Sequence, residues 1–376
     1  MPQRPVNTPP APLTYEATGV DTRGAEESVR TLAKWIEETF TFNSARPLLP
    51  LGYFANVLRL SADLGLAIST DGVGTKLLVA QELGKYDTVG IDCVAMNAND
   101  ILCVGARPVS MVDYVAVERA EPAFLGQIAK GLRDGALAAA INIPGGEIAQ
   151  VREMLHGSAD GHAFDLVGTC VGTVHPDRLI VGQDVRPGDA VVGIASTGLH
   201  SNGFTLARRV LLERAKLRLG EHISELNRTL GEELLEPTRI YVRPVLQMMD
   251  EGLRLKALVH ITGDGFLNLP RVVAPVGFVI DQLLAPPPIF GLIQTHGQVD
   301  DVEMFRVYNM GAGFCVVVDP QDAARVQAIA EQHGHRAAVI GYAVDDPRRR
   351  VWIPQHGLVG EGKEFAVAPD ARVPTA

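Results

Sequence analysis

The stretch Leu66-Ala-Ile-Ser-Thr-Asp-Gly-Val-Gly-Thr-Lys76 decides the fold. Residues 66–70 predict a short buried strand, which ends in the glycine loop of residues 71–76. Residues 92–103 then predict a helix with apolar side chains on most of its surface. A strand, a glycine loop and a helix in succession are typical of an α/β unit.

The same alternation extends in both directions from this stretch. Further strands are predicted at residues 109–117, 164–174, 190–196, 258–262, 314–319 and 337–344, and helices at 29–40, 122–140, 204–219 and 321–333. At about 150 residues per domain, 376 residues correspond to two domains. We expect an α/β fold with mixed sheets, divided into a disordered lead at 1–14, an N-terminal domain at 15–178, a C-terminal domain at 179–353, and a tail at 354–376 that is mobile or pinned to the surface.

Composition excludes several classes of protein. Apolar residues make up 47% of the chain, which excludes wholesale disorder, and the formal net charge of −10 without a basic stripe argues against nucleic acid binding. The uncharged windows at 190–207 and 282–299 are interrupted by polar residues and by three prolines, so neither predicts a membrane span. Four cysteines without a C-x-x-C pair and the lack of a signal peptide predict a soluble, cytoplasmic protein.

The loop at residues 71–76 has the composition of a phosphate-binding loop. Gly72 and Gly74 would let backbone N–H groups approach phosphate oxygens, and Thr75 adds a hydroxyl. Lys76 supplies a positive charge, and Asp71 can hold Mg²⁺. The spacing differs from that of a Walker A loop, and an ordinary turn between a strand and a helix has a similar composition.

Further oxygen ligands are predicted on the next helix and after a later glycine pair. Asp92 and Asn99 lie seven residues apart, nearly on one helix face, and Asp100 follows directly. Gly145-Gly-Glu147 delivers another carboxylate, which could be a third metal ligand. The alternatives are a solvated helix face and an exposed acid on a glycine turn.

Two glycine loops in the second half also carry polar side chains. Gly198-Leu-His-Ser-Asn-Gly203 has the Walker spacing but continues with Phe204 in place of lysine, so it predicts either an anion-binding helix start or a simple N-cap. His260-Ile-Thr-Gly-Asp-Gly265 pairs an imidazole with a carboxylate. No G-x-S-x-G elbow accompanies them, which argues against a serine hydrolase.

Taken together, these loops resemble one known family. The order of motifs resembles that of the phosphoribosylformylglycinamidine cyclo-ligases, also called AIR synthetases. The motifs that carry the resemblance are Gly19-Val-Asp21, Ser69 to Lys76, Asp87 to Asp92, Asn99-Asp100, Gly145 to Glu147, His156-Gly157, His200 to Gly203, Pro237 to Val242, His260 to Gly263 and Asn309-Met-Gly311. The resemblance implies an N-terminal domain that pairs its sheet across a homodimer and a cleft shared with the C-terminal domain. It also implies ATP-dependent cyclisation of a ribonucleotide, assisted by Mg²⁺.

The resemblance further implies roles for individual residues. The catalytic set is Asp71, Lys76, Asp100, Glu147 and His200, of which Asp71, Asp100 and Glu147 would hold Mg²⁺. The nucleotide would contact Gly72, Gly74, Thr75, Lys76 and Asn99. The substrate would contact Ser201, Asn202, His260, Thr262 and Asp264.

The chain also departs from the family pattern near the expected site. Tyr53 and Ala55 stand where the family usually has glycines, Gln150 replaces a glutamate, and Asp264 replaces a glycine. Two alternatives therefore stay open: a related ATP-dependent enzyme similar to thiamine-monophosphate kinase, and a catalytically silent paralogue that binds nucleotide.

Overall fold

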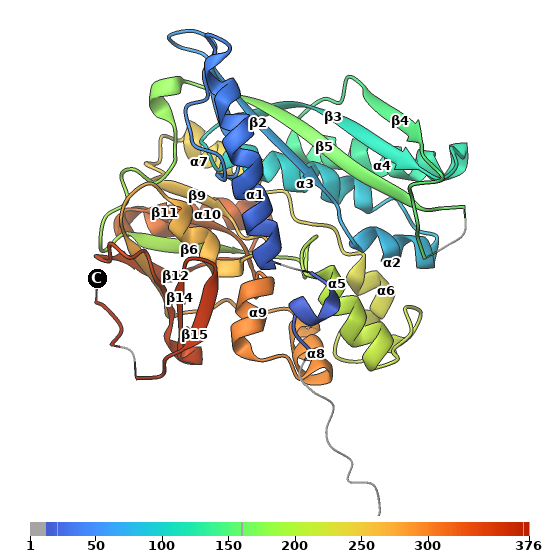
Figure 1. Ribbon diagram of the computed structural model, residues 1–376. Coiled ribbons are helices and arrows are strands. Elements are labelled where there is room, and N and C mark those ends of the chain that lie inside the picture. Colours follow the sequence, from blue (N-terminus) through green and yellow to red (C-terminus); the bar gives the residue numbers. More distant parts are fainter. Residues whose placement is uncertain (1–12, 21, 159–160, 371, 376) are drawn as a thin grey trace, which may run out of the picture.

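The computed structural model describes residues 13–20, 22–158, 161–370 and 372–375. Two mixed sheets, each packed against helices, make up the body of the molecule (Figure 1). A small hairpin of β7 (His222–Ile223) and β8 (Arg228–Thr229) stands apart from both sheets. The predicted α/β class with mixed sheets is confirmed.

The first sheet has five strands. Their spatial order is β1 (Asn56–Arg59), β2 (Gly65–Gly72), β5 (Phe164–Val174), β3 (Arg107–Val117) and β4 (Gly146–Gln150). All neighbours are antiparallel except β3 and β4. Helix α3 (Val89–Leu102) packs against one face and against α4 (Pro122–Ala139). Met111 and Val115 on β3 are buried, whereas Val112 and Tyr114 at the alternate positions are exposed, as is Val109 at the irregularity between Pro108 and Ser110, so the outer face of this sheet exposes apolar side chains.

The second sheet has eight strands. Their order is β15 (Glu364–Val367), β14 (Leu358–Glu361), β13 (Val351–Ile353), β10 (Gly277–Ile280), β12 (Ala337–Val344), β6 (Ala190–Ala195), β11 (Ala312–Val318) and β9 (Ala257–His260). Every residue of β6, β9, β10 and β11 is buried, because helices and loops cover both faces. Helix α10 (Ala323–Gln332) packs on β6 and β12, and α7 (Val242–Asp250) packs on α10.

The remaining helices connect and flank the sheets. They are α1 (Thr22–Ile36), α2 (Lys76–Leu83), α5 (Phe204–Arg208), α6 (Leu230–Leu234), α8 (Pro288–Gly297) and α9 (Asp301–Val307). A π-helical segment at Arg209–Arg214 continues α5, so the helix predicted at 204–219 is shorter and less regular than expected. Among the helices within the described ranges, none is long and apolar enough to span a bilayer.

Two glycine-rich segments are more regular than their sequence indicates. Of the two states predicted for the tail, mobile or pinned, residues 358–367 are pinned, because β14 and β15 extend the second sheet. Gly146 and Glu147 begin the edge strand β4, which pairs with β3, so the glycine turn that was one alternative for them is not formed. The predicted lead at 1–14 lies mostly outside the described residues. The domain boundary near residue 178 stays a prediction; it falls between the end of β5 and the start of β6.

Candidate functional site

The predicted loops from the two halves of the chain meet around the C-terminal end of α3. The side chain of Asn99 joins them, because its Nδ2 donates to the carbonyl oxygen of Arg239 at 2.9 Å and its Oδ1 accepts from the backbone N–H of Tyr241 at 2.9 Å. Asn99 is fully buried. This residue therefore connects the two halves of the chain, and its predicted contact with a nucleotide stays a prediction.

Asp100 pairs with His260 at the end of β9. His260 Nδ1 lies 2.9 Å from Asp100 Oδ1, and its Nε2 lies 3.4 Å from Asn99 Nδ2. The amide group of Asn99 is a donor at Nδ2, so His260 accepts at Nε2 and carries its proton on Nδ1. His260 thus donates to the carboxylate and orients it; the ring itself is fully buried.

Asp71 and Asp100 form the negative centre of the site. Burial, and then the charge of Asp100, raise the pKa of Asp71 to about 6. Two neighbouring carboxylates of this kind favour a cation between them. In the part of the chain that the structure describes, no group of three or more His, Cys, Asp and Glu side chains is arranged to hold a metal. A cation here would need further oxygen ligands from its substrate and from water.

Lys76 is placed differently from the prediction. Its ammonium group is fully buried, and Nζ lies 2.9 Å from the Asp92 carboxylate. Nζ also donates to the carbonyl oxygens of His200 at 3.1 Å and Glu236 at 2.6 Å. All three donor positions of the ammonium are used inside the protein. In this arrangement no donor of Lys76 is left for a triphosphate, and the predicted contact stays a prediction.

His200 and Ser201 also turn inward. The ring of His200 is buried and its Nε2 accepts from the backbone N–H of Thr197 at 3.2 Å, while burial and the neighbouring His260 hold its pKa well below the usual range. Ser201 Oγ lies 2.9 Å from Thr238 Oγ1. In this arrangement both side chains stabilise the loop at residues 197–203, and their predicted roles in catalysis and substrate binding stay predictions.

Glu147 lies away from the other carboxylates. Across the sheet Asp71 aligns with Gly168, Gly168 with Asp113, and Asp113 with Gly146. Glu147 is therefore three strands from Asp71, roughly 14 Å at the usual strand spacing. Because Glu147 is the residue after Gly146, its side chain points to the face of the sheet opposite to that of Asp71. Within one chain the structure therefore brings together two of the three predicted carboxylates, Asp71 and Asp100, and leaves Glu147 apart from them.

The remaining predicted residues are accessible. Gly74 and Thr75 are exposed at the start of α2, and Gly72 is partly exposed. Asn202, Thr262 and Asp264 are also partly exposed. Thr75 Oγ1 lies 3.0 Å from Oγ1 of Thr205, which brings the first turns of α2 and α5 together. Sequence reasoning missed Thr205, although it occupies the Ser/Thr position of the Walker spacing that begins at Gly198.

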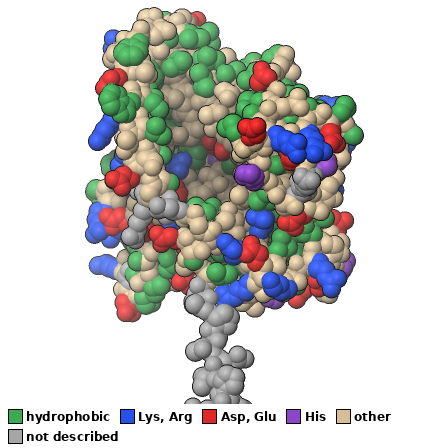
Figure 2. All heavy atoms as spheres, turned by 45° about the vertical axis from the view of Figure 1, so that its right-hand side comes forward, with side chains coloured by type: hydrophobic (Ala, Val, Ile, Leu, Met, Phe, Trp, Pro, Cys, Tyr) green, Lys and Arg blue, Asp and Glu red, His purple; other side chains and the backbone are tan. Residues whose placement is uncertain are grey.

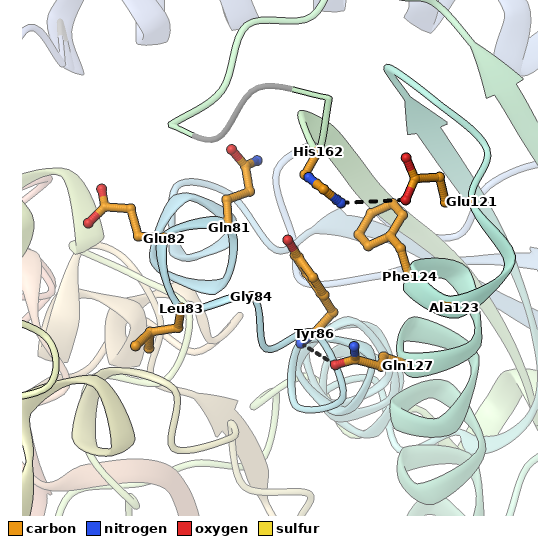
Figure 3. A pocket seen from close by; sticks show the side chains of 10 residues that line it. All are labelled: Gln81, Glu82, Leu83, Gly84, Tyr86, Glu121, Ala123, Phe124, Gln127 and His162. Carbon is orange, nitrogen blue, oxygen red and sulfur yellow. Dashed lines mark hydrogen bonds and ion pairs between the residues drawn. The ribbon is translucent and has the colours of Figure 1, made fainter.

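A separate cavity of about 490 Å³ opens at the other end of α2 (Figure 3). Tyr86, Phe124 and His162 form one wall, and Gln81 and Glu82 form the other. Its lining includes none of the predicted site residues. The loops described above, rather than this cavity, therefore make up the candidate site.

Comparison with known proteins identifies the family to which the chain belongs. Residues 52–174 match the model of the AIR synthase related protein N-terminal domain, and residues 186–354 match that of the C-terminal domain. The phosphoribosylformylglycinamidine cyclo-ligase of Methanocaldococcus jannaschii is 45% identical over 334 residues, which cover 89% of this chain and 93% of the relative. The chain belongs to the phosphoribosylformylglycinamidine cyclo-ligase family. The predicted resemblance and the predicted ligase class of enzyme are confirmed.

Solved structures place the cyclo-ligase fold in a wider group. A thiamine-monophosphate kinase from Stenotrophomonas maltophilia superposes with a TM-score of 0.59 at 19% identity, covering 84% of this chain and 93% of the kinase. A Thermotoga maritima PurL complexed with ADP gives 0.51 at 18% identity, covering 95% of this chain and 54% of that chain. At this identity the likeness concerns the fold alone, so the kinase alternative has much weaker support than membership of the cyclo-ligase family.

Proposed function

We propose that the chain converts formylglycinamidine ribonucleotide to 5-aminoimidazole ribonucleotide in purine biosynthesis, using ATP and releasing ADP and phosphate. Its 45% identity to a cyclo-ligase over nearly the whole length of both chains carries the proposal. The partly exposed Asp71 and Asp100 and the exposed Gly74 and Thr75 just before α2 support it, because they combine a candidate cation site with backbone N–H groups that precede a helix.

The chemistry requires an activated oxygen, because the formyl oxygen is a poor leaving group. In the proposed reaction this oxygen attacks the γ-phosphorus of ATP, which breaks the bond to ADP and gives an iminophosphate. The amidine nitrogen then bonds to the formyl carbon, and the oxygen departs with the phosphate. The protein contributes mainly by positioning the reactants and neutralising their charge.

The donor set suits Mg²⁺ at Asp71 and Asp100, because hard carboxylate oxygens are the ligands it prefers and nucleotide phosphates usually supply the rest. Bound there, Mg²⁺ would neutralise phosphate charge. We assign phosphate binding to Gly72, Gly74 and Thr75, and contacts to the ribonucleotide to Asn202, Thr262 and Asp264.

Phosphate release from Mg·ATP by the purified protein tests the proposal. Release that depends on formylglycinamidine ribonucleotide and yields the aminoimidazole product would support it. Release that depends on thiamine monophosphate would favour the kinase alternative. Nucleotide binding without release would favour the silent paralogue.

Asp264 should tune substrate affinity. It adopts a left-handed backbone conformation with φ of 72°, and its Oδ2 lies 3.5 Å from nitrogens of Arg271 and Lys363. Replacing Asp264 with glycine removes the backbone strain and two partly exposed ion pairs, each worth less than about 1 kcal/mol, so stability should change little. We expect the Michaelis constant for the ribonucleotide to change severalfold. An unchanged constant with a lowered melting temperature would show that Asp264 is purely structural.

We propose that the protein is a homodimer, in which the outer faces of two first sheets pack together. Val109, Val112 and Tyr114 are each more than 40% exposed on this face. Figure 2 shows hydrophobic side chains gathered toward the top of the molecule, where Figure 1 has both the upper end of α1 and the first sheet. Glu147 shares the outer face, so a dimer would bring it to the partner chain.

A charge on this face should break the dimer. We expect Val112→Asp to sediment as a monomer at micromolar concentration, because an unpaired carboxylate would be buried between the two sheets. The control is Val273→Asp, which places the same charge on an exposed valine outside the first sheet. A dimeric Val112→Asp protein would contradict this interface.

We place the reaction in the cytoplasm. All four cysteines are free and buried, which suits a reducing compartment.

The interspersed charges on the face shown in Figure 2 also agree with a small-molecule enzyme rather than a nucleic acid binder.

A further inference from the structure

A buried ion pair lies between the helices of the first sheet and the loops of the second half. Lys76 comes from the first turn of α2 and Asp92 from the first turn of α3, and neither side chain is exposed at all. The reaction proposed above uses neither of them. Their role must therefore be sought in what they hold in place.

The partners of this pair come from distant parts of the sequence. Asp92 Oδ1 accepts from Thr238 twice, from the backbone N–H at 2.7 Å and from Oγ1 at 2.7 Å, and from Ser201 Oγ at 3.3 Å. The bonds from Lys76 to the His200 and Glu236 carbonyls complete the cluster. Two loops of the second half are thus tied to two helices of the first.

Lys76 is also connected to the start of α5. Its Nζ lies 5.5 Å from the centroid of the Phe204 ring, and Phe204 is the first residue of α5. Directly beside it, the Thr75 and Thr205 hydroxyls of the two helices are 3.0 Å apart. The ion pair of Lys76 and Asp92 therefore lies next to the contact between Thr75 and Thr205, where the start of α2 meets the start of α5.

Stability alone is a weak reason for such a pair. Taking two charges out of water costs about as much as their attraction returns, and apolar replacements of buried pairs are often neutral or stabilising. The pair instead fixes the relative positions of the helices and loops that it joins, because each charged group makes several hydrogen bonds at defined distances.

We infer that Lys76 and Asp92 are positioning residues, which hold the starts of α2 and α5 side by side so that both contact the same nucleotide phosphates. This inference rests on the proposed function in one respect, namely that the ligand of these loops is a nucleotide. The pair acts through the loops at 72–75 and 197–203, and touches no substrate itself.

A double substitution separates positioning from plain stability. Lys76→Met and Asp92→Asn alone each leave an unpaired buried group, so both should lower the melting temperature strongly. The double variant Lys76→Met/Asp92→Asn should recover most of that loss. We expect its Kd for Mg·ADP, measured by calorimetry on the folded protein, to stay at least tenfold weaker than that of the wild type, because the loops have lost their anchor.

The chain offers a matched control at the opposite end of the second sheet. Lys256 pairs there with Asp189 and with Asp319, each at 2.6 Å, and the side chains of Lys256 and Asp189 are about 5% exposed or less. Lys256→Met/Asp189→Asn removes a similar buried pair away from the loops, and the carboxylate of Asp319 that remains is partly exposed to water. Its Kd for Mg·ADP should stay within twofold of the wild-type value, whatever happens to its melting temperature.

A milder pair of variants covers the case in which the ion-pair variants do not fold. Thr238→Val removes one hydrogen bond to Asp92, and Thr238→Ser keeps it, so nucleotide affinity should fall in the first and be restored in the second. Wild-type Kd values in the double variant, or in Thr238→Val, would overturn the inference.

The readout also separates the inference from the proposed function. A wild-type protein that binds Mg·ADP but makes no aminoimidazole product contradicts the proposed function and leaves the test of positioning intact. A protein that makes the product with unchanged constants in the double variant contradicts the positioning role alone. A wild-type protein that binds no nucleotide overturns both.

Discussion

Replacing Asp100 with asparagine should abolish Mg·ATP turnover and leave the protein folded. The substitution removes one of the two charges at the cation site and almost no volume. Asparagine retains an oxygen that can accept from His260 Nδ1, the bond now made at 2.9 Å. We expect a loss of about 10³-fold or more in kcat, equivalent to about 4 kcal/mol of transition-state stabilisation. Phosphate release under saturating substrate measures it.

Asp113→Asn is the matched control for Asp100→Asn. Asp113 aligns with Asp71 two strands away on the same sheet, so it carries the same charge on the same face outside the site. Its turnover should stay within about twofold of wild type. Turnover by Asp100→Asn at the wild-type rate, with the circular dichroism of a folded protein, would show that the carboxylate pair plays no part in the reaction.

Regular elements could be predicted from the sequence because their signal is local. Strands β5 and β12 begin and end at the predicted residues, since their apolar and small residues repeat within a few positions. The strands of the tail were not predicted, because its glycines and prolines leave little periodicity. Gly360 is a glycine for another reason: a Cβ there would lie 2.4 Å from Leu267, so close packing requires its absence.

The site could be predicted only in part, because side-chain direction depends on segments far along the chain. The charge of Asp100 acts on Asp71, and their shared cation stays a prediction. Lys76 turns inward because Asp92 and the carbonyls of His200 and Glu236 lie beneath it, and no pattern near residue 76 reveals them. The face on which Glu147 lies depends on the register of β3 and β4, and a shift of one residue would reverse it.

Replacing Asp71 with asparagine should stabilise the metal-free protein while it removes activity. The pKa of Asp71 is raised to about 6 in the folded chain, chiefly by burial and then by Asp100, against about 4 for an ordinary aspartate. The folded chain therefore holds this proton more tightly than the unfolded chain, and stability falls as the pH rises from about 4 to about 6. Asparagine is neutral throughout and can keep the bond that Asp71 Oδ1 accepts from the Gly72 N–H at 2.8 Å.

The expected gain at pH 8 is therefore about 2–3 kcal/mol relative to wild type, and it should shrink as the pH is lowered toward 4. Thermal unfolding of both proteins at pH 8 and pH 5 measures this gain in stability. Equal melting temperatures of the two proteins at both pH values would refute the claim that the charged Asp71 carboxylate destabilises the folded chain. Mg²⁺ added at pH 8 should raise the melting temperature of the wild type and have little effect on Asp71→Asn, because binding to the folded state stabilises it only where the ligands are present. A variant that is more stable, inactive and unresponsive to Mg²⁺ would show that burying the Asp71 carboxylate, next to the charge of Asp100, is the cost in stability of keeping a cation site ready.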